Sequence, residues 1–211
     1  MVSGEPIESP AEATAQESVA PANPFTAADV STILHERGWI DPGTSPGTPA
    51  YSRGDAPSAQ LRPCPDEEWE AWLADAAALL GPHAADRDAL AELLGLIFQY
   101  DAGAILRSPE SHVILAREGA REVVRELAHL VLQGPEIDSH RLKEIVTALK
   151  EKLRFRGREL FHPVRLALAG RAGTGELDRV ILLLDRAARL PFRVRVKGTR
   201  QRMLEFCAAL E

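Results

Sequence analysis

The sequence predicts an all-α protein, an irregular bundle of helices that follows an N-terminal stretch of low complexity. Apolar residues recur at three- and four-residue intervals from Asp66 to the C-terminus, which is the periodicity of helices with one buried face. The pairs Gly81-Pro82 and Gly134-Pro135 each end one of the predicted helices. The sequence contains no β-α-β pattern and no internal repeat, so we expect helices packed through short connections.

Residues 1–64 are predicted to be a disordered, low-complexity tail that contains one short amphipathic helix. Residues 1–25 hold mainly Ala, Pro, Glu, Ser and Thr, so burial of apolar surface cannot offset the cost of ordering them. Residues 41–65 are rich in turn-forming residues and are expected to be a linker. Residues 26–38 between them predict a helix, with Thr26 as its N-cap and Gly38 at its end.

The short helix has one apolar face, and two roles for that face are open. Val30, Ile33 and Leu34 form the face, and Trp39 follows directly after the helix. An isolated helix of this length is only marginally stable in water. The face therefore either docks into a groove of a partner protein or folds back onto the chain's own helical domain.

From residue 65 onward we expect two helical subdomains, residues 65–153 and residues 154–211. Helices of the first are predicted at residues 66–80, 86–106, 118–133 and 138–155, with Ser111 as the cap of a short turn. Helices of the second are predicted at residues 159–169, 176–189 and 200–210. Pro163 is expected in the first turn of its helix, where proline is tolerated. Residues 191–196 are expected to form an extended connector.

The sequence lacks the signatures of a catalytic, metal or cofactor site. None of its six histidines stands in an HExxH motif, and neither a Walker loop nor a GxSxG motif occurs. Cys64 and Cys207 have no metal-binding spacing. The glycines of residues 170–175 lie between two predicted helices and not after a strand, so they do not indicate a dinucleotide site. We therefore expect no catalytic residue, no metal and no cofactor.

Hydropathy and cysteine usage point to the cytoplasm. No run of 18 apolar residues occurs, and the N-terminus has neither a basic start nor an apolar core. We expect no membrane segment and no secretory signal. Two cysteines do not make a disulfide framework, so a cytoplasmic location is expected.

Charge is distributed unevenly along the chain. The net charge is −6, yet residues 141–211 carry 17 Lys and Arg against 8 Asp and Glu. This asymmetry indicates that the C-terminal part of the chain has a surface suited to a polyanion such as a nucleic acid. The alternative is a solvated helical surface that is rich in arginine.

The segment FRGRELFHPVRLALAG, residues 155–170, and the TGEL that follows at residues 174–177 have a specific spacing. They resemble the segment of glutamyl-tRNA synthetases that reads Lys-Gly-Lys-x-Leu-Phe-x-Pro, then apolar-Arg-apolar-Ala-Leu-Thr-Gly. The matching residues are Gly157, Leu160, Phe161, Pro163, Arg165, Ala167, Leu168 and Gly170. Residues 91–106 are also similar to a helix of that family. The resemblance covers about residues 65–189 and implies a helical bundle of the class I synthetase anticodon-binding type.

The resemblance implies a surface that binds the anticodon stem and loop of tRNA. It nominates Arg165 as an arginine that contacts bases, and Gly173, Thr174, Gly175 and Leu177 as a turn beside them. Arg154, Arg156 and Arg158 are predicted to contact phosphates. Arg193, Arg195, Lys197 and Arg200, with Arg202, are predicted to extend this surface. The alternative for Arg165 is a structural arginine that pairs with a carboxylate.

The sequence departs from the family pattern at three positions. Ala169 replaces a usual threonine, Gly175 replaces a common proline, and Asp178 stands where an apolar or aromatic residue often follows. A carboxylate at position 178 would repel phosphate. The two motifs with which the family's catalytic domain binds ATP do not occur, so the chain alone should not activate glutamate.

The leading hypothesis is a tRNA-binding module that is not catalytic on its own and acts in glutamyl-tRNA aminoacylation. Its expected partner is a glutamate or glutamine tRNA, with no DNA and no membrane. Two alternatives are open. One is a protein–protein interaction scaffold with a decayed tRNA surface, and the other is a subunit of a split glutamyl-tRNA synthetase that works with a separate catalytic chain.

Overall fold

The structure, a computed structural model, describes residues 23–40 and 66–211. The predicted disorder of residues 1–22 and the predicted linker at residues 41–65 lie outside these residues. Within the two described ranges, the backbone forms ten α-helices and one short 3₁₀ turn, with no β-strand. The predicted all-α class is confirmed.

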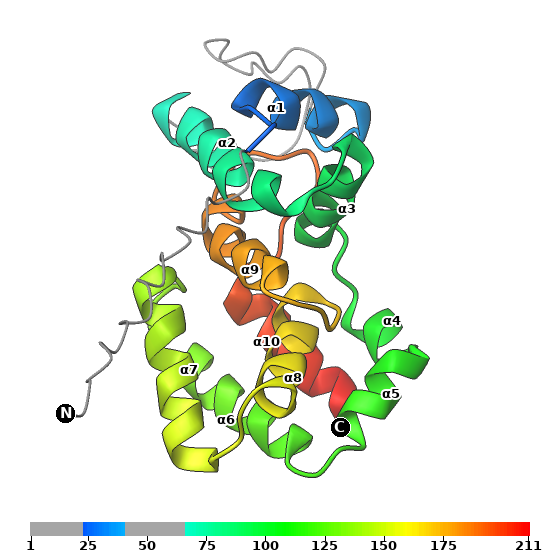
Figure 1. Cartoon of the computed structure of the whole chain (residues 1–211), viewed down its shortest axis with the longest axis vertical. Coiled ribbons are helices and arrows are strands. Elements are labelled where there is room, and N and C mark those ends of the chain that lie inside the picture. Colours follow the sequence, from blue (N-terminus) through cyan, green and yellow to red (C-terminus); the bar gives the residue numbers. More distant parts are fainter. Residues whose placement is uncertain (1–22, 41–65) are drawn as a thin grey trace, which may run out of the picture.

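The helices form an elongated bundle in which α8, α9 and α10 run through the middle (Figure 1). Their bounds are α1 Ala27–Glu36, α2 Asp66–Leu80, α3 Arg87–Phe98, α4 Ala102–Arg107, α5 Pro109–Leu115, α6 Ala120–Gln133, α7 Ser139–Leu153, α8 Arg158–Ala169, α9 Glu176–Ala187 and α10 Thr199–Leu210, with the 3₁₀ turn η1 at Gly81–His83. α8 packs on α6, α9 packs on α2 and α3, and α10 packs on α4 and α6. Contacts therefore cross the subdomain boundary that was predicted between residues 153 and 154.

Helix α1 begins and ends where the sequence predicts. The hydroxyl of Thr26 accepts a hydrogen bond from the backbone N–H of Asp29 (3.3 Å), and the Asp29 carboxylate accepts one from the backbone N–H of Thr26 (2.8 Å). This reciprocal pair is a capping box, which satisfies backbone donors that have no partner inside the helix. Gly38 follows the helix with a φ of 69°, a left-handed conformation that glycine adopts without strain.

An aromatic cluster fixes α1 and the C-terminal connector to the rest of the bundle. It consists of Trp39, Trp69, Trp72, Phe98 and Phe192. Trp39 stacks on Phe98 with ring centroids 4.4 Å apart, and Phe192 meets Phe98 edge-on at 4.8 Å. Large aromatic side chains contribute much of the burial energy of a small core. Residues from both ends of the described chain therefore share one core with α2 and α3.

The apolar face of α1 is part of this core. Val30, Ile33, Leu34 and Trp39, the residues predicted to dock on a partner, are each at most 5% exposed. The backbone N–H of Arg193 donates to the carbonyl oxygen of Trp39 (2.9 Å). The structure thus adopts the second of the two alternatives, in which the segment folds back onto its own domain. These side chains cannot dock on a partner while α1 is in place, because their surface is already buried.

The single helix predicted at residues 86–106 is two helices, α3 and α4, so that prediction was wrong. The helical conformation ends at Gln99 and resumes after Asp101, whose carboxylate accepts from the backbone N–H of Ala104 (3.0 Å). Tyr100 in the break is buried and its hydroxyl donates to the carbonyl oxygen of Ala167 (2.6 Å). A tertiary contact therefore overrides the helical periodicity of this segment.

Three smaller differences concern helix ends. Ser108, and not Ser111, caps α5. α7 ends at Leu153 because Arg154 takes a left-handed conformation with a φ of 59°. Pro163 was predicted in the first turn of α8 but lies in the second turn. Because proline has no backbone N–H, it removes one hydrogen bond of the helix there.

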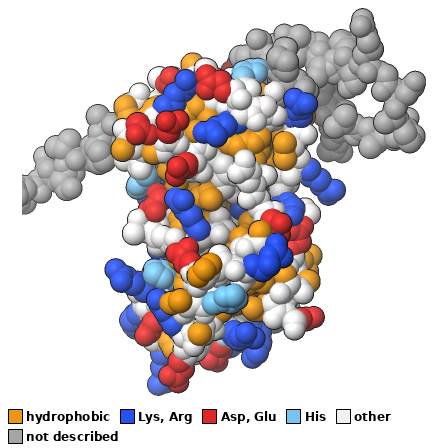
Figure 2. Space-filling model, turned by 90° about the vertical axis from the view of Figure 1, so that its right-hand side faces the viewer, with side chains coloured by type: hydrophobic (Ala, Val, Ile, Leu, Met, Phe, Trp, Pro, Cys, Tyr) orange, Lys and Arg blue, Asp and Glu red, His pale blue; other side chains and the backbone are white. Residues whose placement is uncertain are grey.

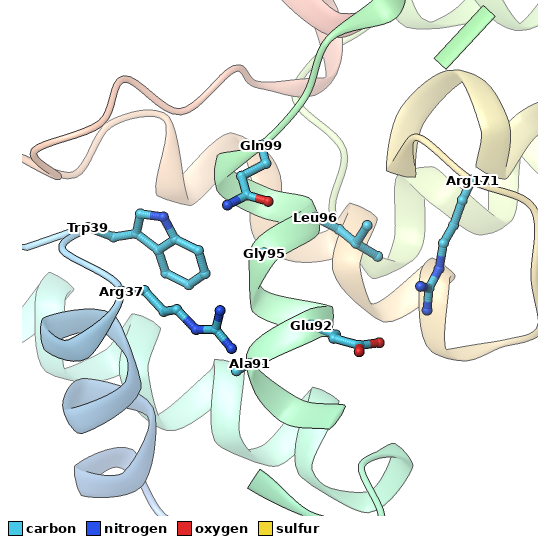
Figure 3. A pocket seen from close by; sticks show the side chains of 8 residues that line it. All are labelled: Arg37, Trp39, Ala91, Glu92, Gly95, Leu96, Gln99 and Arg171. Atoms are coloured by element: carbon cyan, nitrogen blue, oxygen red, sulfur yellow. The ribbon is translucent and has the colours of Figure 1, made fainter. Parts of the chain in front are cut away.

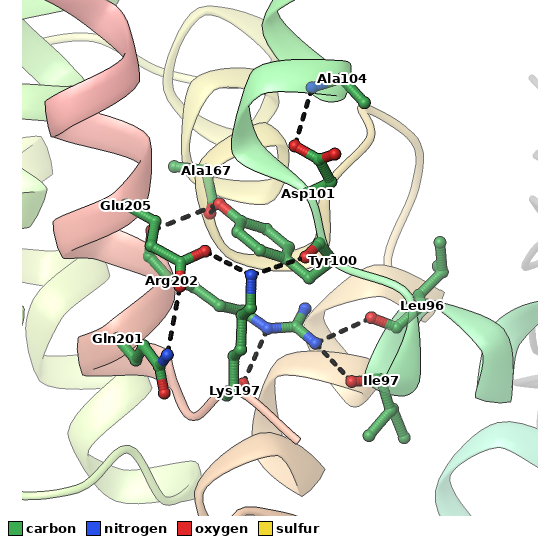
Figure 4. Close-up of polar contacts among 10 residues, drawn as sticks. All are labelled: Leu96, Ile97, Tyr100, Asp101, Ala104, Ala167, Lys197, Gln201, Arg202 and Glu205. Atoms are coloured by element: carbon green, nitrogen blue, oxygen red, sulfur yellow. Dashed lines mark hydrogen bonds and ion pairs between the residues drawn. The ribbon is translucent and has the colours of Figure 1, made fainter. Parts of the chain in front are cut away.

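Arg202 is fully buried and connects the ends of three helices. Its guanidinium donates to the carbonyl oxygens of Leu96 (2.9 Å), Ile97 (2.6 Å), Leu168 (2.8 Å) and Lys197 (2.9 Å), as Figure 4 shows for three of these residues. The last carbonyls of a helix have no partner within that helix. Arg202, in the first turn of α10, therefore supplies hydrogen-bond donors to the last carbonyl groups of α3 and α8. The expectation that Arg202 extends an RNA-binding surface was wrong, because it is 0% exposed.

The Arg202 side chain stays protonated although it is buried. The guanidinium lies 4.5 Å from the centroid of the Tyr100 ring, which offers a favourable face for a cation. Burial lowers the pKa of Arg202 to about 10, so the side chain remains positively charged at neutral pH. The start of α10 is fixed by a second buried group, since Asp185 accepts from the backbone N–H groups of Thr199 (2.7 Å) and Ile137 (2.8 Å).

We expect replacement of Arg202 by Met to lower the free energy of unfolding by at least about 3 kcal/mol, because several buried carbonyl oxygens lose their donor. The measurement is urea unfolding followed by circular dichroism. Arg200→Ala is the matched control on the same helix, because Arg200 is exposed and makes only a long hydrogen bond, of 3.4 Å. Its effect should stay within about 0.5 kcal/mol. Equal effects of the two replacements would contradict this account of Arg202.

Candidate nucleic-acid interface

The connection between α7 and α8, taken together with the first residue of α8, carries three exposed arginines, Arg154, Arg156 and Arg158. It lies toward the lower end of the molecule in Figure 1. Phe155 in this connection packs its ring directly over Gly119, and a Cβ atom at Gly119 would collide with the ring. The contact joins the arginine-bearing connection to the one between α5 and α6, so the three arginines are presented by an anchored segment.

A groove of about 360 Å³ runs between α7, α8 and α9. Its basic residues are Lys143 and Lys150 of α7 and Arg179 of α9, and its aromatic residue is Phe161 of α8. The Lys150 ammonium lies 5.5 Å from the centroid of the Phe161 ring. Ser139, Leu142, Val146, Thr147 and Leu182 complete the walls together with Gly175 and Asp178. The groove therefore runs along α7, from Ser139 at its start to Lys150 in its last turn, and reaches Gly175 in the turn between α8 and α9.

This combination of side chains suits single-stranded nucleic acid. An unpaired base stacks on an aromatic ring, and Lys and Arg contact the phosphates on either side. Lys143, Lys150, Phe161 and Arg179 were not predicted from the sequence to contact RNA. One signal was present, because Lys143 and Lys150 are seven residues apart and so lie on the same face of α7.

Arg165, the residue predicted to contact bases, is held inside the protein. Its Nε and Nη2 atoms donate to the two carboxylate oxygens of Asp178 (2.8 and 2.7 Å), and its Nη1 atom donates to the carbonyl oxygen of Gly173 (2.7 Å). The guanidinium lies 4.9 Å from the centroid of the Phe161 ring, and the side chain is only 11% exposed. The structure thus places Arg165 in the alternative role, as a structural arginine paired with a carboxylate.

The turn between α8 and α9 presents some of its predicted residues and buries others. Thr174 and Gly175 are exposed, whereas Leu177 is 0% exposed because it begins the apolar face of α9. The backbone N–H of Thr174 donates to the carboxylate of Glu176 (3.1 Å). Leu177 was predicted to lie beside the bases of the RNA. Its side chain is buried in the core instead, so it cannot contact RNA from this position.

The basic residues of the C-terminal segment lie away from the groove. Residues 190–198 pass α1, α2 and α3 at the upper end of Figure 1, so the exposed Arg193 and Arg195 are far from the α7–α8 connection. Lys197 is half-buried, and its ammonium group is held by the carboxylate of Glu205 (2.6 Å) and the carbonyl oxygen of Tyr100 (3.0 Å), to both of which it donates. Proximity in the sequence therefore did not predict proximity in space for these residues.

Two other surface regions do not have the charge pattern of the groove. On the face that carries α4 and α5, Lys and Arg side chains are interspersed with Asp and Glu (Figure 2). A smaller hollow of about 240 Å³ lies where the end of α1 meets α3. Its two arginines, Arg37 and Arg171, stand on opposite sides of α3, with Glu92 between them (Figure 3). They do not converge on one ligand.

His162 lies near three arginines, on the side of α8 that faces the α5–α6 connection. Burial lowers the pKa of His162, and the nearby guanidinium groups of Arg117, Arg158 and Arg165 lower it further, while Glu110 acts in the opposite direction. His162 is therefore mainly neutral at pH 7. An anion that binds beside it would favour its protonated form.

Among the residues that the structure describes, no three His, Cys, Asp or Glu side chains form a metal-binding group. No helix in the described part is long and apolar enough to cross a membrane.

The structure is thus a helical bundle that carries a basic groove and exposed arginines beside it, and comparison with known proteins identifies its family. Residues 56–190 match the model of the anticodon binding domain family. This is more than half of the chain, which therefore belongs to that family. The chain is 34% identical over 84 residues to glutamate–tRNA ligase 2 of Syntrophus aciditrophicus (strain SB). These findings confirm the resemblance to the anticodon-binding domain of glutamyl-tRNA synthetases.

The match with the ligase is partial. It covers 40% of this chain and 15% of the ligase. No solved structure matches the chain.

The anchoring of the α7–α8 connection can be tested at Gly119. Gly119→Ala should lower the free energy of unfolding and speed tryptic cleavage after Arg154, Arg156 and Arg158, because the new methyl group displaces Phe155. Gly38→Ala is the matched control. Gly38 also has a positive φ, but a Cβ atom there would meet nothing within 4 Å, so only backbone strain of about 1–2 kcal/mol is added. Unchanged cleavage in the Gly119 variant would contradict the anchoring.

Proposed function

We propose that the chain binds tRNA in the groove between α7, α8 and α9, with the α7–α8 connection contacting neighbouring phosphates. The observation that carries this proposal is the groove itself, which is lined by Lys143, Lys150 and Arg179 together with the ring of Phe161. Membership of the anticodon-binding family supports tRNA as the nucleic acid. The name of the related ligase supports a glutamate isoacceptor, with glutamine as the alternative.

In this proposal the chain acts in glutamyl-tRNA aminoacylation and is not catalytic on its own. The family's ATP-binding motifs do not occur in residues 1–211. In this proposal a separate catalytic chain in the cytoplasm activates glutamate. An aminoacylation assay with and without such a chain tests this part separately from tRNA binding. A role as a protein–protein scaffold through α1 has less support, because the apolar face of α1 is buried.

The first test measures binding of fluorescent tRNA-Glu by anisotropy at several salt concentrations. We expect binding at low salt that weakens steeply as salt rises, because each phosphate contact releases condensed counterions. An excess of duplex DNA should compete weakly, since a stacked duplex cannot place a base on Phe161. Absence of binding at protein concentrations up to about 100 μM in low salt would overturn the proposal.

Replacing both Lys143 and Lys150 by Ala should weaken tRNA binding and reduce the salt dependence. Loss of two phosphate contacts should lower the slope of log affinity against log salt by about 1.4, at about 0.7 per contact for a single strand. Arg87→Ala is the control, because Arg87 is an exposed arginine paired with Glu36 (2.9 Å) on α1, remote from the groove. If the control and the double variant lose affinity equally, the groove is not the binding site.

Binding of tRNA should also take up a proton at His162. Because the pKa of this side chain is lowered in the free protein, a phosphate nearby raises it, and affinity increases as the pH falls from about 8 to about 6. His162→Gln should bind with a flatter pH profile while its affinity at pH 8 stays close to that of the wild type. A pH profile that is identical in the two proteins would show that no phosphate lies beside His162.

A further inference from the structure

The pair formed by Arg165 and Asp178 lies at the end of the proposed RNA groove, and its geometry bears on which RNA the groove selects. All three nitrogen atoms of the Arg165 guanidinium already donate hydrogen bonds, two to Asp178 and one to Gly173. The distances of 2.7–2.8 Å are those of charge-assisted bonds. One face of the guanidinium is covered by Phe161. The edge formed by Nε and Nη2, which could otherwise make a bidentate contact with a base, is thus taken by Asp178, and one face of the guanidinium is taken by Phe161.

Freeing Arg165 would leave an unfavourable charge in the groove. Asp178 lines the groove, and its side chain is 30% exposed. If the guanidinium turned toward a base, the carboxylate would lose its bidentate partner and would face the RNA as an uncompensated negative charge. Bidentate arginine–carboxylate pairs are among the stronger side-chain interactions. The pair therefore persists when RNA enters the groove.

The groups that remain for RNA do not distinguish one base from another. Lys143, Lys150 and Arg179 contact phosphates, which carry no sequence information. Stacking on Phe161 tolerates any base, because every base has a flat face. Recognition of a base edge needs donors that the fold holds in a fixed direction, as it holds those of Arg165. Arg179 is also a guanidinium, but it is exposed on α9 and is assigned here, like the two lysines, to the phosphates.

We propose that Asp178 holds Arg165 out of contact with RNA, so that the groove accepts an unpaired nucleotide without selecting its base. Asp178 is then the residue that determines specificity at this site. This inference rests on the proposed function, because it concerns the same groove. It makes a different claim, since RNA binding can be present whether or not Arg165 contacts a base.

The experiment uses the full chain and a set of tRNA anticodon stem-loops that differ at one loop nucleotide at a time. The readout is the ratio of affinities within one protein, so any partly unfolded fraction cancels. Wild type should bind all members within about twofold, and Arg165→Gln should leave this narrow spread unchanged. Asp178→Ala frees the guanidinium, and the spread at one loop position should widen to at least about fivefold, as expected for a directed arginine–base contact.

Two further variants decide whether the widened spread comes from Arg165. In the double variant Asp178→Ala, Arg165→Gln, the spread of affinities among the stem-loops should return to about twofold. Asp75→Ala is the matched control, because Asp75 is also paired with an arginine, Arg186, but does not line the groove. It removes the same charge and should leave the narrow spread unchanged.

A wide spread in the wild type, a change of spread in Arg165→Gln, or an Asp178→Ala spread no wider than that of Asp75→Ala would each overturn the inference. Failure of the proposed function looks different. In that case no stem-loop binds, and the Lys143 and Lys150 replacements have no effect.

Discussion

The buried guanidinium of Arg202 is the interaction on which the architecture depends. It enters the bundle from the first turn of α10 and binds carbonyl oxygens at the ends of α3 and α8. These helix ends meet inside the protein, where water cannot satisfy their acceptors, so a multidentate cation is one of few groups that can stabilise them. The position of α8 follows from this contact. Since α8 supplies Phe161, one wall of the basic groove also depends on it.

Both segments that lie outside the family match are part of the same core. Residues 56–190 match the anticodon binding domain family, whereas α1 and α10 stand on either side of that range. α10 supplies Arg202, and α1 with Trp39 covers α2 and α3, where Phe192 joins the aromatic cluster. A fragment cut to the matched range would therefore expose aromatic side chains and leave helix ends without donors. The folded unit is larger than the family match.

The periodicity of the sequence predicted most helices because each buries one regular apolar face. Thr26 and Gly38 bound α1 as expected, since a cap is a local interaction. The break at residues 99–101 was missed because contacts from distant parts of the chain hold it. Tyr100 donates to the carbonyl oxygen of Ala167, and Arg202 binds the carbonyl oxygens of Leu96 and Ile97. In the candidate site, the arginines of the α7–α8 connection were found from the sequence. The pairing of Arg165 with Asp178 was only one of two alternatives, because sequence alone does not give the orientation of side chains across a turn.

The hydrogen bond between Trp39 and Arg193 has a consequence for folding. Helical proteins fold fast when their contacts are local in sequence, but here the two ends of the described chain must meet. Trp72 likewise donates to the carbonyl oxygen of Leu183, 111 residues away. During synthesis α10 leaves the ribosome after α3 and α8, so the carbonyl ends of these two helices lack their donor until Arg202 has emerged. The nascent domain is therefore incomplete until α10 is available, and it is most exposed to aggregation during this interval.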